Sequence, residues 1–197
     1  MIKRIILTLI IVFNIQSLTK ADDIKDFQIE GLSVGDSLLI HMSKKKIEQL
    51  KKYQVYPNKK FYTLYLEKEF FNLNTYDFIQ IDLKRGDKNY ILPVVGGVID
   101  FPNNINKCKI KKKKIIDDII NTFPNLIRED RNSAHPQDKT NKSLVYQTYF
   151  RLKNGAIVID CEDWSDAMEK NYNFVDQLKI YVLTNDYNNW LNKEAYN

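Results

Sequence analysis

Apolar and polar residues alternate with a period of two along several stretches of this chain, which is the pattern of half-buried β-strands. The alternation is visible in residues 61–67 and 76–84, and further strands are predicted at 89–101, 144–153, 156–161 and 178–183. Arg85 to Lys88 supplies turn residues between two of these stretches, and Asn154-Gly155 favours a tight turn with positive φ between two others. Gly96-Gly97 predicts a bend or bulge inside 89–101. The sequence therefore predicts an antiparallel sheet built largely from hairpins.

Other stretches place apolar residues at steps of three and four, as amphipathic helices do. The clearest begins at Cys108 and ends at Phe123, just before Pro124, which cannot continue a helix. Shorter helices are predicted from the end of the turn at 31–36 to residue 42, at 44–52 and at 187–196. The fold class that follows is α+β, an antiparallel sheet with short packed helices.

Residues 128–143 form the longest polar stretch of the chain. They contain one alanine and otherwise only polar, charged or proline positions, which predicts an exposed, mobile loop. We expect a single α+β domain over 22–197. The alternative is two packed halves, 22–127 and 144–197, joined by this loop.

The first residues have the layout of a secretory signal peptide. Lys3 and Arg4 precede the apolar run from Ile5 to Phe13, and Thr19 and Ala21 supply small residues for cleavage after Ala21. A membrane anchor is the alternative, but a bilayer needs about 20 apolar residues and this run has roughly half that. We therefore expect residues 1–21 to be a signal peptide. The mature chain would be periplasmic, without a transmembrane segment.

Removal of the leader changes the charge of the protein. It takes away Lys3, Arg4 and Lys20 and no acid, so the formal net charge falls from +5 to +2. A nucleic-acid-binding protein usually carries a strong and localised basic excess, so we expect no nucleic acid as a partner. Lysine is abundant and arginine scarce, 25 against 5, and lysine runs therefore carry little information by themselves.

Five lysines lie close together on the predicted helix that begins at Cys108. They are Lys109, Lys111, Lys112, Lys113 and Lys114. Asp117 and Asp118 follow one turn later and can pair with them for a few tenths of a kcal/mol each. This pattern favours a solvated helix face. The alternative is peripheral binding to anionic lipid, where each lysine near the surface contributes about 1 kcal/mol.

Cys108 and Cys161 are the only cysteines of the chain. In an exported protein two cysteines most simply form one disulfide. Closing the loop between Cys108 and Cys161 would lower the conformational entropy of the unfolded chain, which would stabilise the fold by about 4 kcal/mol. The chain has no C-x-x-C pair, and two cysteines and two scattered histidines do not make a zinc site. We expect no metal.

The strongest candidate for ligand chemistry is an acidic stretch that follows a predicted strand. It comprises Asp160, Glu162, Asp163, Trp164 and Asp166. Acids beside a tryptophan could bind a cation or a sugar, and two suitably placed carboxylates could hydrolyse a glycoside. A solvated turn explains the same residues. His41 and His135 have no nucleophile motif beside them, and the chain contains no Walker, dinucleotide-binding or H-E-x-x-H motif, so we expect no cofactor.

Three stretches resemble a family of uncharacterised exported proteins from free-living marine alphaproteobacteria with small, A/T-rich genomes. They are FQIEGLSVGDSLL at 27–39, FRLKNGAIVIDCEDWS at 150–165 and NNWLNKEAY at 188–196. The resemblance covers most of the mature chain and implies export, but no activity. Together with the absence of catalytic motifs, it leads us to expect a non-catalytic binding or assembly module of the cell envelope, partnered by an envelope protein or an anionic lipid surface. An envelope hydrolase using the acids at 160–166 is the alternative.

Overall fold

The computed structural model describes residues 23–197 and shows an α+β protein, as the sequence predicts. The proposed signal peptide, residues 1–21, lies outside the described residues. One antiparallel sheet holds most of the strands in the order β3-β4-β5-β9-β8-β7-β6. Its strands are β3 (Phe61–Glu67), β4 (Phe78–Lys84), β5 (Val94–Asp100), β6 (Ile127–Ala134), β7 (Leu144–Leu152), β8 (Gly155–Asp163) and β9 (Gln177–Thr184).

In the described part of the chain, four α-helices and a small hairpin accompany this sheet, and two of the helices pack directly on it. The α-helices are α1 (Lys44–Gln49), α2 (Ile105–Thr122), α3 (Asp166–Tyr172) and α4 (Asn185–Lys193). Two 3-10 turns, η1 (Ile24–Asp26) and η2 (Leu38–Ile40), flank the hairpin of β1 (Gln28–Ile29) and β2 (Leu32–Ser33). Within residues 23–197, no helix combines the length and apolar character that crossing a membrane requires.

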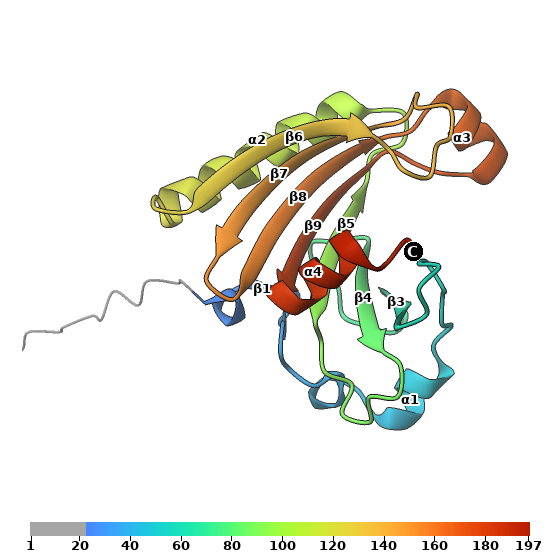
Figure 1. The fold of residues 1–197 in the computed structure, drawn as a ribbon, viewed down its shortest axis with the longest axis vertical. Helices are drawn as coiled ribbons and strands as arrows, with labels where there is room; N and C mark the ends of the chain where they lie inside the picture. Colours follow the sequence, from blue (N-terminus) through green and yellow to red (C-terminus); the bar gives the residue numbers. More distant parts are fainter. Residues whose placement is uncertain (1–22) are drawn as a thin grey trace, which may run out of the picture.

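The sheet curves around α4, and α2 lies along its outer side (Figure 1). We call these two sides the α4 face and the α2 face. On β8, Ile157, Ile159 and Cys161 point to the α2 face and belong to the larger apolar core. Ala156 and Val158 point the other way and pack with the smaller core around α4. Alternate residues of one strand therefore serve two separate cores.

Helix α2 forms where its apolar residues recur every three or four positions. Asn104 caps it by accepting a hydrogen bond from the Lys107 N–H at 3.1 Å, and Phe123 ends it before Pro124. Cys108 is fully buried and bonded to Cys161 of β8, with the two Cα atoms 6.0 Å apart. The predicted disulfide is therefore confirmed, and it joins α2 to the centre of the sheet.

Helix α4 begins where Thr184 accepts a hydrogen bond from the Tyr187 N–H at 3.1 Å. Its buried side holds Tyr187 and Trp190, which pack on the α4 face. The Tyr187 hydroxyl donates to Asp82 of β4, which also accepts from the Thr63 hydroxyl at 2.6 Å. Burial raises the pKa of Asp82, and its hydrogen bonds from Thr63 and Tyr187 act in the opposite direction.

The prediction of a helix after the turn at 31–36 is wrong. Residues 28–33 form the hairpin of β1 and β2, and only the short turn η2 follows. Gly31 and Gly35 have φ values of 80° and 91°, a conformation that glycine adopts at no steric cost and that a helix does not contain. The Gly35 N–H then donates to the Leu92 carbonyl at 2.8 Å, so the backbone pairs with a neighbouring segment.

The prediction of a mobile loop at 128–143 is wrong for its first half. Residues 127–134 form the edge strand β6, paired with β7 along its whole length. Both faces of an edge strand can remain in water, and this one carries charged residues in place of an apolar alternation. Beyond it, the Asp138 carboxylate accepts hydrogen bonds from Thr140 and from the Ser143 N–H, at 2.8 and 2.9 Å, which organises the following turn.

Two predicted local features also differ from the structure. The two-residue turn between β7 and β8 is Lys153-Asn154, and neither residue has a positive φ. Gly155 is instead the first residue of β8, where a Cβ would overlap the Leu183 carbonyl oxygen. Gly96 and Gly97 pair in regular register with Gln80 and Ile79, and no bulge interrupts the strand. Glycine is required at these places because other groups lie close to the backbone.

Candidate functional site

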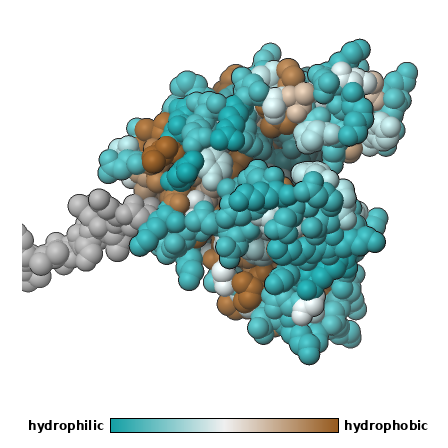
Figure 2. All heavy atoms as spheres, in the orientation of Figure 1, coloured by the Kyte–Doolittle hydropathy of each residue, from teal (hydrophilic) through white to brown (hydrophobic). Residues whose placement is uncertain are grey.

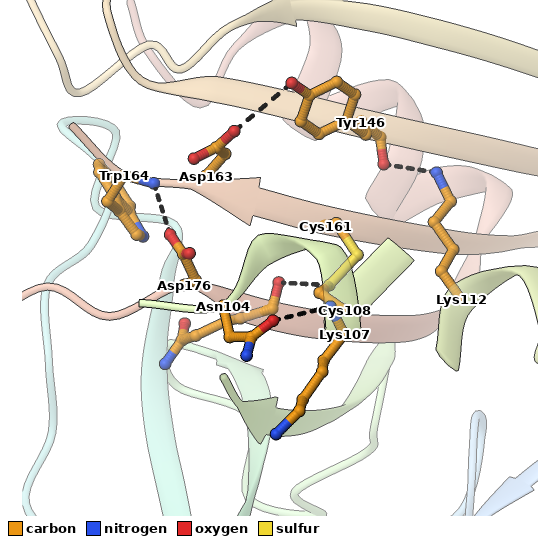
Figure 3. Close-up of a disulfide and its surroundings, with 10 residues drawn as sticks. Asn104, Lys107, Cys108, Lys112, Tyr146, Cys161, Asp163, Trp164 and Asp176 are labelled. Atoms are coloured by element: carbon orange, nitrogen blue, oxygen red, sulfur yellow. Dashed lines mark hydrogen bonds between the residues drawn. A yellow bond between two sulfur atoms is a disulfide. The ribbon is translucent and has the colours of Figure 1, made fainter. Parts of the chain in front are cut away.

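The structure brings two of the four predicted acids together. Asp160 and Glu162 of β8 point to the α4 face, while Asp163 points to the α2 face, where its carboxylate accepts from the Tyr146 hydroxyl at 3.4 Å. Figure 3 shows Asp163 turned toward Tyr146 beside the disulfide. Asp166 lies farther along the chain, in the first turn of α3. The acidic stretch is therefore divided between two faces and a helix.

Trp164 does not offer a free aromatic surface. Its ring centroid lies 4.0 Å from that of His135 and 4.3 Å from that of Phe174, and the residue is only 7% exposed. Its backbone N–H donates to Asp176 at 2.9 Å (Figure 3). The indole therefore connects the turn after β6 to the segment before β9.

Glu162 is held between two basic side chains. The Lys179 ammonium of β9 lies 2.8 Å from one carboxylate oxygen, and Nε2 of His135 lies 3.7 Å from the other. The other ring nitrogen of His135 accepts from the Gln137 N–H at 3.2 Å, which orients the imidazole. Burial opposes ionisation, but Lys179 and His135 outweigh it and hold the pKa of Glu162 at about 2. Each carboxylate oxygen thus faces a basic side chain, although the buried Oε2 makes no hydrogen bond.

Asp160 has one oxygen without a partner. It lies between Lys179 and Gln147 in the sheet register and is 8% exposed. One oxygen accepts a long hydrogen bond of 3.4 Å from the Gln147 amide, whereas the other, Oδ1, is buried and makes no hydrogen bond. Burial, followed by the nearby charge of Glu162, raises the pKa of Asp160 to about 7. The pKa values of these two neighbouring carboxyls are therefore shifted in opposite directions.

The five predicted lysines of α2 have different surroundings. Lys112 is buried, and its ammonium donates to the Tyr146 carbonyl at 2.5 Å (Figure 3). The Lys109 ammonium lies 3.6 Å from the centroid of the Tyr146 ring. Lys113 is exposed and pairs with Asp117 at 2.8 Å, as the sequence predicts. Lys112 therefore does not lie on the solvated face that the sequence predicts. The exposed positive charge of α2 comes from its other lysines.

Lys111 lines an apolar groove between α2 and the hairpin of β1 and β2. The groove has a volume of about 190 Å³. Apart from Lys111, its lining is mostly apolar and includes Phe27, Tyr76, Ile99, Ile115, Ile119, Ile157, Ile180 and Val182. These residues come from segments far apart in the sequence, so no single motif could have indicated the groove.

A second hollow lies beside η2. It has a volume of about 550 Å³ and is wide open, with Glu30, His41 and Phe71 in its lining. The Glu30 carboxylate already accepts from the N–H groups of Asn74 and Thr75, at 3.0 and 2.6 Å. This places His41 at an open surface, away from the acids of β8.

The face in Figure 2 is mainly hydrophilic with separate hydrophobic areas. Among residues 23–197, no group of three histidine, cysteine, aspartate or glutamate side chains is placed to hold a metal ion. Comparison with protein-family models, with curated proteins and with solved structures finds no match for this chain.

Proposed function

We propose that this protein is an exported, non-catalytic binding module of the cell envelope. In this proposal the leader is cleaved near Ala21, and the mature chain resides in the periplasm and binds an anionic amphiphile. The observation that carries the proposal is the apolar groove beside α2 with Lys111 in its lining. The disulfide between Cys108 and Cys161 supports an oxidising compartment.

The groove suits one apolar chain. Its volume of about 190 Å³ is below the 300–1,000 Å³ typical of pockets for drug-sized ligands, so it fits a segment of an acyl chain better than a whole lipid. Burying each methylene of such a chain contributes about 0.8 kcal/mol. Ile115 and Ile119 on the helix and Ile180 on the sheet give the chain apolar walls on both sides.

The charge beside the groove favours an anionic head group. Lys111 lies at the groove, and Lys107 and Lys114 are exposed on the same helix. A lysine near an anionic surface contributes about 1 kcal/mol. Lys113 contributes less, because Asp117 already neutralises it at 2.8 Å. An amphiphile with its chain in the groove and its anionic head at Lys111 would use both features.

The hydrolase alternative has weaker support. Glycoside hydrolysis uses two carboxyl groups that flank the scissile bond. Asp160 and Glu162 share a face, but both oxygens of Glu162 are engaged with Lys179 and His135. Oδ1 of Asp160 and Oε2 of Glu162 both lack a hydrogen bond, but the Glu162 oxygen lies 2.8 Å from the Lys179 ammonium and is less available for catalysis.

Calorimetric titration of the mature chain, residues 22–197, with decanoate tests the proposal, and decyl maltoside serves as an uncharged probe with the same chain. Lys111→Glu should weaken decanoate binding about tenfold, a change of about 1.4 kcal/mol, and leave decyl maltoside binding unchanged. Lys113→Glu, on the same helix but outside the groove, is the matched control. Ile119→Trp should fill the groove and remove binding of both probes.

Two results would count against this function. The first is a parent protein that binds neither probe. The second is an equal effect of Lys111→Glu and Lys113→Glu, because that would indicate attraction to the helix as a whole and no role for the groove.

A further inference from the structure

The part of the α4 face around Asp160 carries a different kind of surface from the groove. Side chains there follow the rows of the sheet register. One row runs through Tyr65, Gln80, Gly96, Tyr181, Val158 and Tyr149, and the next through Phe78, Val98, Lys179, Asp160 and Gln147. Amides and tyrosines on this face are half-buried, whereas Asp160 beneath them is buried.

The Tyr181 ring lies flat in this face. A Cβ at Gly96 would overlap two of its ring carbons, so the ring covers the glycine backbone directly. The Tyr181 hydroxyl donates to the Gln80 side chain at 3.2 Å, which fixes the direction of the ring. Tyr149 lies two strands away in the same row, and its hydroxyl accepts from Asn188 of α4 at 3.0 Å. Aromatic rings held in this way offer apolar faces beside polar groups.

Several charged groups of this face are paired with one another. Lys179 is committed to Glu162 at 2.8 Å. On β6, Glu129 pairs with Arg131 at 2.6 Å and with Arg151 at 2.9 Å. Apart from Asp160 itself, a ligand bound here would therefore meet mostly compensated charge, and this condition favours a neutral molecule.

Asp160 is one of four residues within 23–197 that have a buried side-chain polar atom without a hydrogen bond; the others are His41, Glu162 and Trp190. Oδ1 of Asp160 makes no hydrogen bond, and a buried polar atom without a partner costs about 1–3 kcal/mol. The other oxygen, Oδ2, accepts from the Gln147 amide at the long distance of 3.4 Å. A hydroxyl group suits this position in either ionisation state, because it can donate to a carboxylate or accept from a carboxylic acid.

From these observations we infer that the α4 face beside Asp160 is a binding site for a small neutral polyhydroxylated ligand, a sugar. The sugar hydroxyls would complete the hydrogen bonding of Asp160 and bond to the Gln147 amide, and its apolar ring face would lie on Tyr181. Since Glu162 is held by Lys179 and His135, the ligand is bound and not cleaved. This site is on the opposite side of the sheet from the groove, so either proposal can be refuted by experiment without affecting the other.

Amide NMR of the mature chain, titrated with glucose, galactose, N-acetylglucosamine and maltose, tests the inference. At least one sugar should shift the amide signals of Asp160, Gln147 and Tyr181. Asp160→Leu should weaken that binding about tenfold or more, the effect of losing one hydrogen bond to a charged or polar group. Asp117→Asn, on the outer side of α2, should bind as the parent does.

A second variant guards against a folding defect in Asp160→Leu. Gln147→Ala keeps the buried carboxyl and removes only the half-buried amide, so it should fold and bind several-fold more weakly. The inference is overturned if no sugar shifts these amides, or if both variants bind as the parent does. It is also overturned if ethylammonium chloride produces the same shifts as the best sugar, because the site would then be selecting a cation.

Discussion

Replacing Asp160 with asparagine should change how the stability of the protein depends on pH. Burial and the nearby Glu162 charge raise the pKa of Asp160 from its ordinary 3.8 to about 7. Lys179 and Lys112 act in the opposite direction but do not restore the ordinary value. As the pH rises, the folded chain therefore keeps the Asp160 proton up to a higher pH than the unfolded chain does.

The sign of the effect follows from this difference in bound protons. Between pH 3.8 and about 7 the folded state holds more protons at Asp160 than the unfolded state, so the contribution of Asp160 to stability falls as pH rises. One pKa unit corresponds to about 1.36 kcal/mol, so the whole gap corresponds to about 4 kcal/mol. Asparagine has nearly the same shape and does not titrate. As the pH rises from about 4 to about 8, the free energy of unfolding of Asp160→Asn should therefore increase by about 4 kcal/mol relative to that of the parent.

Urea unfolding of the mature chain, followed by far-ultraviolet circular dichroism at a series of pH values, measures this difference. Asp117→Asn is the control, because Asp117 is an exposed acid on α2, and its curve should run parallel to that of the parent. Glu162→Gln provides a second check, since removing the Glu162 charge should move the Asp160 titration to lower pH. Parallel curves for Asp160→Asn and the parent would refute the reasoning, because Asp160 would then ionise equally easily in both states.

Three further changes test the structural framework by urea unfolding. Replacing both Cys108 and Cys161 with alanine opens a link across a sequence separation of 53 and should cost about 4 kcal/mol; a loss below about 1 kcal/mol would contradict the chain-entropy argument. Lys179→Met removes the closest cation from buried Glu162 and should cost about 3–5 kcal/mol at neutral pH. That loss should shrink in acid, where Glu162 takes up a proton, and a loss independent of pH would contradict the assignment. Gly155→Ala should cost about 1–3 kcal/mol through overlap with the neighbouring strand, and an unchanged midpoint would contradict it.

The sequence was most informative where one side of an element faces a core. The strand at residues 61–67 was predicted with its observed bounds. Leu64 and Leu66 point into the larger core, whereas Tyr65 between them points to the other face of the sheet. Helix α2 was predicted for the same reason, with Cys108 and Ile116 on its buried side. Strand β6 was missed because an edge strand exposed on both faces carries no apolar alternation for a pattern to reveal.

The candidate sites were predictable only in part. Alternation along β8 alone separates Asp160 and Glu162 from Asp163, so the sharing of one face by two acids was accessible from the sequence. The partners of those acids were not, because Lys179 and His135 come from other segments. Their approach depends on how strands pair across the sheet, which local sequence does not specify.

The position of Cys161 explains how these features stay in register. It lies between Asp160 and Glu162 on β8, so the disulfide to α2 and the two acids are at the same level of the strand on opposite faces. A shift of one residue would turn Cys161 toward α4 and place both carboxylates in the apolar core beneath α2. Burying an unpaired carboxylate there costs several kcal/mol, and the bond to Cys108 could not form. The covalent link and the charge pairing therefore select the same register, which places Asp160 on the α4 face.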